Sequence, residues 1–165
     1  MKKFEGLEGI GMSDRETWDF LTRSKSTLQL ATTNSDGTPV IHPVWYLFEP
    51  ATTKLYFYTE PGLKKAVNIR RRSQVYFCID SDKWPYKGVK GRGRARLVPS
   101  KERALSYGAR ILAKYVKKGR PLSKSAFDKM KEGGYVIFEI TPSFFTSWDF
   151  GKLDPDGSLK ESIIS

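Results

Sequence analysis

A chain of 165 residues corresponds to about one domain, and its 39% of hydrophobic residues are enough for one sizeable core. No hydrophobic run approaches the roughly 18 residues of a membrane span, and the basic N-terminus is not followed by the apolar segment of a secretory signal. The single cysteine excludes an internal disulfide or a paired-cysteine zinc site, and the single histidine excludes metal motifs built on histidine pairs. We therefore expect a cytoplasmic protein without a resident metal.

The charge balance is strongly basic, since 29 Lys and Arg residues against 18 Asp and Glu residues leave a net charge of +11. This excess favours an anionic partner, whether nucleic acid, a phosphate-bearing ligand or an acidic substrate. Aromatic residues make up 13% of the chain, a proportion that suits β-structure or the binding of a flat ring.

The first third of the chain predicts a helix, a β-hairpin and a further strand. Ser13 and Glu16 have the spacing of a capping box, which marks the start of a helix. The sequence Asn34-Ser-Asp-Gly37 is a strong turn signal between two β-rich segments, as in a hairpin. The expected elements are a helix over about 14–25 and strands over 27–33, 40–48 and 55–59.

Glycine and proline divide the rest of the chain. Pro61-Gly62 breaks the chain before a short basic helix, Ser100 is placed to cap a longer helix, and Gly133-Gly134 supplies a C-cap. The expected elements are a helix over 63–72, strands over 75–79 and 88–98, helices over about 101–118 and 123–132, and closing strands over 135–140 and 143–150, separated by Pro142.

Six or seven short strands with hairpin turns predict an antiparallel barrel with a few helices packed on it. The chain has no internal repeat and no linker, so we expect one α+β, mainly β domain over residues 1–165. Its core lies at about 14–150, and the C-terminal tail over 151–165 is expected to be loosely ordered.

Two basic clusters are candidate anion sites. In the strand over 88–98, alternation places Lys90, Arg92, Arg94 and Arg96 on one face at intervals of about 7 Å. Such a row favours an anionic ligand, although a solvated outer face of a half-buried strand explains it equally well.

The second cluster follows Pro61-Gly62, where Lys64 and Lys65 coincide with a strand end and a helix N-terminus. Backbone amides, the helix dipole and lysine side chains together form a plausible phosphate cradle. The alternative is an ordinary charged helix face.

The segment His42-Pro43-Val44-Trp45-Tyr46 is a candidate ring-binding strand. A proline within a strand cannot donate to the ladder, so the strand must lie at a sheet edge or be bulged. An opened ladder beside aromatic residues suits a planar ligand, whereas the simpler alternative is an edge strand with Trp45 in the core. A lone strand histidine is more often structural than catalytic.

The order of these features resembles one known family. The segments that carry the resemblance are Leu30-Ala-Thr-Thr33, Asp36-Gly37, Val40-x-x-Pro43-Val44-Trp45-Tyr46, Leu55-Tyr-Phe-Tyr-Thr59, Lys65-Ala-Val-Asn68-Ile69, Val75-Tyr-Phe-Cys78 and Gly93-Arg-Ala95-Arg-Leu97. Over roughly residues 14–150 the chain is similar to the pyridoxamine 5′-phosphate oxidase-like family of flavin-binding split β-barrel proteins. The resemblance implies an antiparallel Greek-key split β-barrel with flanking helices.

The resemblance also implies a homodimer that binds FMN, or in one branch coenzyme F-420, in a groove at the subunit interface. The strand at 42–46 would offer its backbone to the isoalloxazine ring, and a closing strand would reach the ring across the interface. The cofactor-binding residues implied in this way are His42, Pro43, Val44 and Trp45 at the ring, Tyr58, Thr59, Lys64 and Lys65 at the phosphate, and Trp148 from the closing strand.

The chain departs from the oxidase pattern, in which an arginine stands at the position of His42, a lysine at Leu47 and a serine at Leu63. These departures favour the oxidoreductase branch over oxidation of pyridoxamine phosphate itself. The leading hypothesis is an FMN-binding oxidoreductase that transfers a hydride at flavin N5 to or from a small-molecule substrate. The cofactor carries this chemistry, so no catalytic side chain is assigned.

Three alternatives remain open. The first is a coenzyme F-420-dependent reductase of the same fold. The second, from another class, is a basic small-barrel protein that binds nucleic acid on a cationic strand with aromatic stacking. The third is a haem-binding split barrel, for which His42 is the only histidine ligand available.

Overall fold

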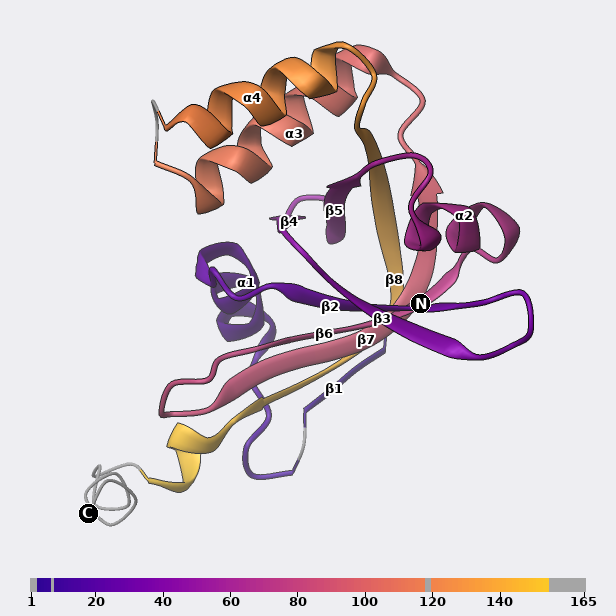
Figure 1. Ribbon diagram of the computed structural model, residues 1–165. Helices are drawn as coiled ribbons and strands as arrows, with labels where there is room; N and C mark the ends of the chain where they lie inside the picture. Colours follow the sequence, from indigo (N-terminus) through magenta and orange to yellow (C-terminus); the bar gives the residue numbers. More distant parts are fainter. Residues whose placement is uncertain (1–2, 7, 118–119, 155–165) are drawn as a thin grey trace.

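The computed structural model describes residues 3–6, 8–117 and 120–154. Its strands are β1 (Lys3–Gly6), β2 (Leu28–Thr33), β3 (Pro39–Val44), β4 (Tyr46–Glu49), β5 (Lys54–Thr59), β6 (Gln74–Asp80), β7 (Lys87–Leu97) and β8 (Val136–Asp149). The helices are α1 (Asp14–Arg23), α2 (Lys64–Arg71), α3 (Lys101–Tyr115), α4 (Pro121–Lys131) and a short 3-10 helix, η1 (Phe150–Leu153) (Figure 1).

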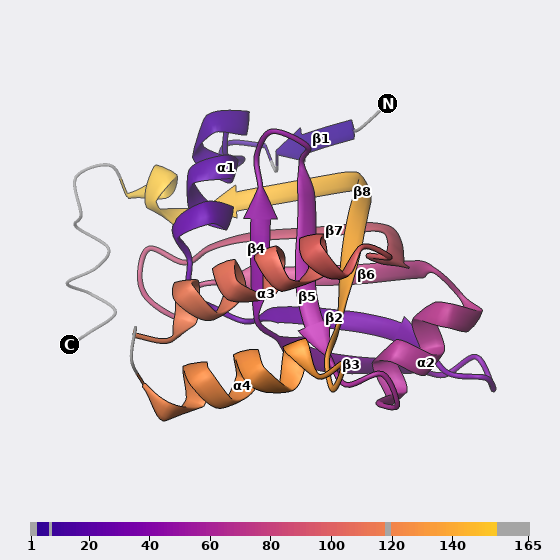
Figure 2. The same ribbon diagram turned by 90° about the horizontal axis from the view of Figure 1, so that it is seen from above.

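Seven of the strands follow the order β3-β2-β6-β7-β8-β5-β4 and are paired antiparallel. The remaining strand, β1, lies parallel to β8 and was not predicted from the sequence. Helix α3 lies across β4, β5 and the first half of β8, and α4 lies beside α3, whereas α2 lies at one end of β2 and β3 (Figure 2). This architecture confirms the predicted α+β, mainly β split barrel with flanking helices.

The capping signal at the first helix is also confirmed. Ser13 Oγ accepts a hydrogen bond from the Glu16 amide, and the Glu16 carboxylate accepts one from the Ser13 amide at 2.7 Å. Both hydrogen bonds satisfy amides at the helix start that have no partner within the helix.

The hydrophobic run over 40–48, predicted as one strand, forms two. β3 pairs with β2 and β4 pairs with β5, so the two strands lie at opposite ends of the strand order, with Trp45 between them. Because Pro43 has no N–H to donate, β3 is suited to the edge of the sheet, where the chain then crosses to the other edge. The barrel is therefore open between β3 and β4, which follow each other in the chain at Trp45 but do not pair.

The closing strands, predicted as two, form the single strand β8. Its pairing with β7 shifts register where Arg92 faces Phe144 and Gly93 faces Pro142, which leaves Ser143 as the extra residue of a bulge. A proline is tolerated at such a bulge. Gly93 is needed there, because a Cβ on it would collide with the Thr141 carbonyl.

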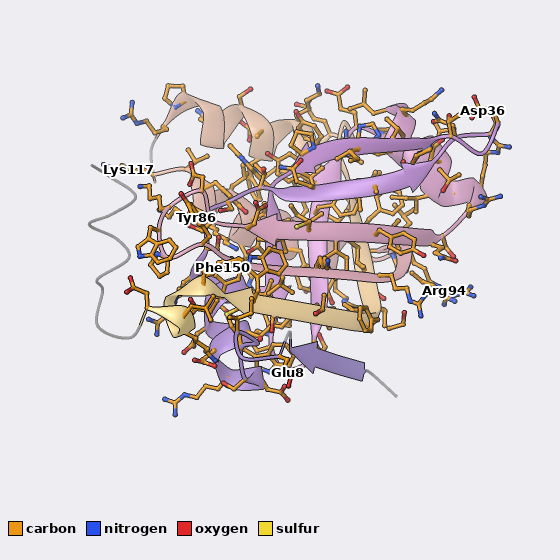
Figure 3. All side chains as sticks on the ribbon, turned by 90° about the horizontal axis from the view of Figure 1, so that it is seen from below. Glu8, Asp36, Tyr86, Arg94, Lys117 and Phe150 are labelled. Atoms are coloured by element: carbon orange, nitrogen blue, oxygen red, sulfur yellow. The ribbon has the colours of Figure 1, made fainter. Side chains whose placement is uncertain are left out.

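The predicted loosely ordered tail begins with regular structure, since η1 covers Phe150–Leu153. The Phe150 amide donates a hydrogen bond to the Tyr86 carbonyl at 3.0 Å, which ties η1 to the loop between β6 and β7 (Figure 3). Residues 155–165 lie outside the described part of the chain.

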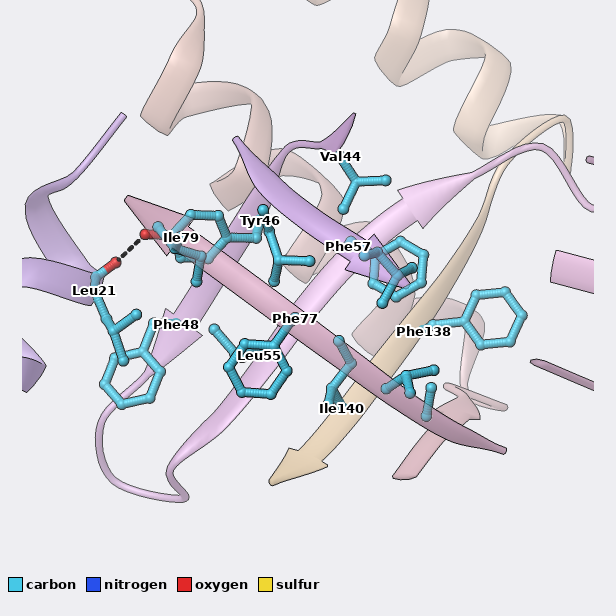
Figure 4. Packing of buried hydrophobic residues seen from close by; sticks show 14 of the residues in the cluster. Leu21, Val44, Tyr46, Phe48, Leu55, Phe57, Phe77, Ile79, Phe138 and Ile140 are labelled. Atoms are coloured by element: carbon cyan, nitrogen blue, oxygen red, sulfur yellow. Dashed lines mark hydrogen bonds between the residues drawn. The ribbon is translucent and has the colours of Figure 1, made fainter. Parts of the chain in front are cut away.

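The core has two parts on either side of β5. The barrel interior contains, among others, Tyr46, Leu55, Phe57, Phe77 and Ile140 (Figure 4). A second cluster, formed by Tyr56, Val98, Ile111, Met130 and Ile137, lies between the sheet and helices α3 and α4. Because both faces of β5 are covered, consecutive residues of this strand are buried, instead of every second one. Within the described ranges, no helix is long and apolar enough to cross a membrane.

Candidate cofactor site

A pocket of about 310 Å³ lies where the β3–β4 junction, the end of β5 and the start of α2 meet. Its lining residues are Pro43, Val44, Trp45, Tyr58, Thr59, Glu60, Leu63, Lys65 and Tyr135. Six of the nine cofactor-binding residues predicted from the sequence are therefore brought together from three separate elements. His42, Lys64 and Trp148 do not line this pocket.

The polar end of the pocket is formed by the turn from β5 into α2. Thr59 closes β5 opposite Val136, and Pro61-Gly62 then leads to Leu63, which caps α2 without a side-chain hydrogen bond. The N-terminus of α2 therefore keeps its preference for an anion, and the pocket opens beside it.

The two lysines at the start of α2 have different surroundings. Lys65 is half-buried at the pocket, and burial lowers its pKa while the Glu60 carboxylate opposes this effect. Lys64 is exposed and faces the β2–β3 turn: the pKa of Asp36 is lowered first by hydrogen bonds from Thr38 and also by the Lys64 charge. Lys65 is therefore the cation of the pocket.

Asn68, one helical turn after Lys65, fixes α2 to the hairpin. Its buried side-chain amide donates to Thr32 Oγ1 at 3.1 Å and to Asn34 Oδ1 at 3.0 Å. The Lys-x-x-Asn spacing thus joins a pocket residue to the residue that anchors its helix.

His42 lies near Lys65 of α2 but does not line the pocket. Burial lowers the pKa of its imidazole, and the nearby Lys65 charge lowers it further. Its Nε2 atom is buried and has no hydrogen-bond partner in the described part of the chain. Leaving a buried polar atom without a hydrogen bond costs free energy. A ligand that reaches Lys65 could supply the missing hydrogen-bond partner of Nε2.

The apolar end of the pocket is an aromatic wall. The Trp45 and Tyr58 rings meet edge to face at 6.4 Å, and Tyr58 meets Tyr135 in the same way at 5.1 Å. At the rim, Lys129 of α4 pairs with Glu60 at 2.6 Å and lies 5.0 Å from the Tyr135 ring centre.

Sequence reasoning missed Tyr135, Glu60 and Leu63 as pocket residues. Glu60 adjoins the predicted phosphate residue Thr59, which was a usable local signal. Tyr135 begins a predicted strand, but only the pairing of Val136 with Thr59 shows which end of β8 meets the pocket.

Trp148 lies at the other end of β8, some 12 residues and roughly 40 Å of strand from Val136. It stands opposite Gly88, where a Cβ would collide with the indole ring. Within one chain it therefore does not reach the pocket.

The fold and this pocket define a split-barrel protein with a candidate phosphate and ring site. The sequence profile of the pyridoxamine 5′-phosphate oxidase family matches residues 14–149, which confirms the resemblance seen in the sequence. The chain belongs to this family. No functionally curated protein matches it in sequence.

Solved structures share the fold. The conserved hypothetical protein Rv2991 from Mycobacterium tuberculosis is 29% identical, with a TM-score of 0.77 over 91% of this chain and 92% of that one. An F-420 reductase is 20% identical, with a TM-score of 0.60 over 78% and 94% of the two chains. HutZ, the haem storage protein of Vibrio cholerae, is 16% identical, with a TM-score of 0.61 over 79% and 91%.

Proposed function

We propose that this protein binds FMN in the pocket at the start of α2 and acts as a flavin-dependent oxidoreductase on a small-molecule substrate. The observation that carries the proposal is the meeting of Lys65, Thr59 and the β3–β4 junction in one pocket, although they come from three elements. The phosphate would lie against Lys65 and the α2 N-terminus, and the ring against the Trp45 end.

The residues present fit a phosphate-bearing cofactor. His42 Nε2 is buried without a partner close to Lys65, and a phosphate oxygen at Lys65 would supply one.

The flavin, when bound, supplies hydride transfer at N5. The chain's own residues have simpler tasks. Lys65 holds the phosphate, the backbone beside Pro43 orients the ring, and the wall of Trp45, Tyr58 and Tyr135 excludes water from it.

Coenzyme F-420 is the second candidate for the same pocket, since it also joins a flat ring to a phosphate. Titration of the apoprotein with FMN, riboflavin and F-420 separates these possibilities. We expect saturable binding of FMN and much weaker binding of riboflavin. Preferential binding of F-420 would instead identify a reductase of that branch, and binding of neither would reject the proposal.

We further propose that the functional unit is a homodimer. The outer face of β3, β2, β6 and β7 lies on the side of the sheet away from α3 and α4 (Figure 3). A mainly apolar hollow lies on this face, lined among others by Ile41, Tyr76 and Phe144. On this face Ile41 is 64% exposed and Tyr76 is 50% exposed, beside the half-buried Phe144. A second copy would cover these residues, and its Trp148 would be available to the cofactor that its partner binds.

A further inference from the structure

Helix α3 supports the aromatic wall of the pocket through a residue that no sequence motif had linked to the site. Tyr115, the last residue of α3, lies parallel to the Trp45 indole, with ring centres 5.0 Å apart and planes inclined by 2°. Trp45 lines the pocket, and Tyr115 lies behind it.

The backbone at Trp45 is not held by a strand. The pairing of β3 ends at Val44, and that of β4 begins at Tyr46. The Trp45 side chain therefore depends on ring contacts for its orientation, and besides Tyr115 it meets Tyr58 edge to face at 6.4 Å.

Tyr115 is itself fixed from both sides. Its hydroxyl donates to the Ser26 carbonyl at 3.0 Å and accepts from the Tyr46 amide at 3.4 Å. Burial raises the pKa of Tyr115 to about 12, so the hydroxyl keeps the proton that it donates. The ring is thus tied to the segment after α1 and to the first residue after Trp45.

We propose that Tyr115 is a positioning residue, whose ring holds the Trp45 indole in the pocket wall in the orientation that receives the planar ring of the cofactor. This inference rests on the proposed function for the identity of the ligand. Helix α3 would then orient a residue of the site in addition to packing on the sheet.

The same helix offers a matched control. Tyr107 stacks on Tyr56 with ring centres 3.8 Å apart and planes inclined by 12°, and neither ring lines the pocket. Loss of this stack removes a similar contact from α3 without touching Trp45.

The experiment compares Tyr115→Leu, Tyr115→Phe and Tyr107→Leu with the parent protein. Acrylamide quenching in the free protein measures the accessibility of Trp45, with a Trp45→Phe variant to subtract the other three tryptophans. Titration with FMN and with riboflavin measures the effect on binding, and far-UV circular dichroism confirms that each variant is folded.

We expect Tyr115→Leu to increase the quenching of Trp45 and to weaken FMN and riboflavin by the same factor, about 2- to 10-fold. Tyr115→Phe keeps the ring and should restore most of both properties. Tyr107→Leu should change neither.

Unchanged quenching in Tyr115→Leu would overturn the inference, as would equal effects of Tyr115→Leu and Tyr107→Leu. The quenching arm needs no ligand, so it decides whether Tyr115 positions Trp45 even if the parent protein binds no flavin. That last result would reject the proposed function instead.

Discussion

At the scale of single residues, the proposal that the pocket binds the phosphate of FMN depends mainly on Lys65. A charge-assisted hydrogen bond is worth roughly 1.5–3 kcal/mol, so Lys65→Ala should weaken FMN about 10- to 150-fold. Riboflavin has no phosphate and should bind the variant and the parent alike. Fluorescence titration with both ligands measures the difference.

The neighbouring Lys64 is the control, because it is exposed and faces Asp36 instead of the pocket. Lys64→Ala should reduce FMN affinity far less than Lys65→Ala. If Lys65→Ala weakened riboflavin as much as FMN, the lysine would act through the structure and not through the phosphate.

A second residue, Lys114, makes stability depend on pH. Its ammonium group donates to the Leu21 carbonyl at 3.2 Å and lies 3.6 Å from the Tyr46 ring centre, with no carboxylate paired to it in the described ranges. Burial lowers its pKa to about 7, although the ring face favours the charged form.

Between the lowered pKa near 7 and the ordinary value of 10.5, the unfolded chain binds more protons at Lys114 than the folded protein does. This group therefore makes the free energy of unfolding rise with pH across that window, and its burial costs most below pH 7. Lys114→Met should flatten the rise in urea unfolding series from pH 6 to pH 9. An unchanged slope would show that Lys114 stays charged in the folded protein.

At the scale of elements, strand β7 presents the cationic row formed by Lys90, Arg92, Arg94 and Arg96, all of them exposed as alternation predicts. A groove of about 640 Å³ beside the row includes Arg92, Arg94 and Arg96. The carboxylate nearest in register, Glu139 opposite Arg96, is already paired with Lys54 at 2.9 Å. Arg94 and Arg96, which do not line the hollow of the proposed dimer face, thus remain available to an external anion.

The double variant Arg92→Ala with Arg94→Ala tests this availability. It should leave FMN affinity unchanged and cost under about 0.5 kcal/mol of stability, because both side chains are exposed. Affinity for an F-420-type ligand with an acidic tail should fall, and its dependence on salt should flatten. An identical salt slope in variant and parent would reject a ligand role for the row.

The same variant addresses the nucleic-acid alternative. Binding of single-stranded oligonucleotides that falls steeply with salt, and that is lost in the variant, would favour that class over a flavoprotein.

At the scale of the whole molecule, the proposed homodimer leads to a separate prediction. Ile41→Arg places a charge in the centre of the apolar outer face, on a side chain that is already 64% exposed in one chain. The fold should survive, while sedimentation should show a monomer in place of the dimer. Val67→Arg, on an apolar side chain of α2 that is 42% exposed and outside this face, is the control.

If Ile41→Arg remained a dimer, the interface would have to lie on another face. If the parent protein were a monomer at micromolar concentration, the proposed dimer would be wrong.

The sequence by itself determined most of the elements and most of the pocket. Capping at Ser13, the turn at Asn34–Gly37, the break at Pro61-Gly62 and the alternation of β7 are local signals, set by residues only a few positions apart. Thr59 and Lys65, the proposed phosphate-binding residues, lie close together in the chain, so their meeting in one pocket followed from the same local signals.

Only the tertiary structure decided what depends on pairing between distant segments. The division of 40–48 at Trp45 follows from which strands accept β3 and β4, and the continuity of β8 through Pro142 follows from a bulge against β7. The separation of Trp148 from the pocket and the approach of Tyr115 to Trp45 have the same origin. Local periodicity specifies which residues share a face of an element, but strand order and helix placement are set by contacts between segments far apart in the chain, where a local pattern carries no information.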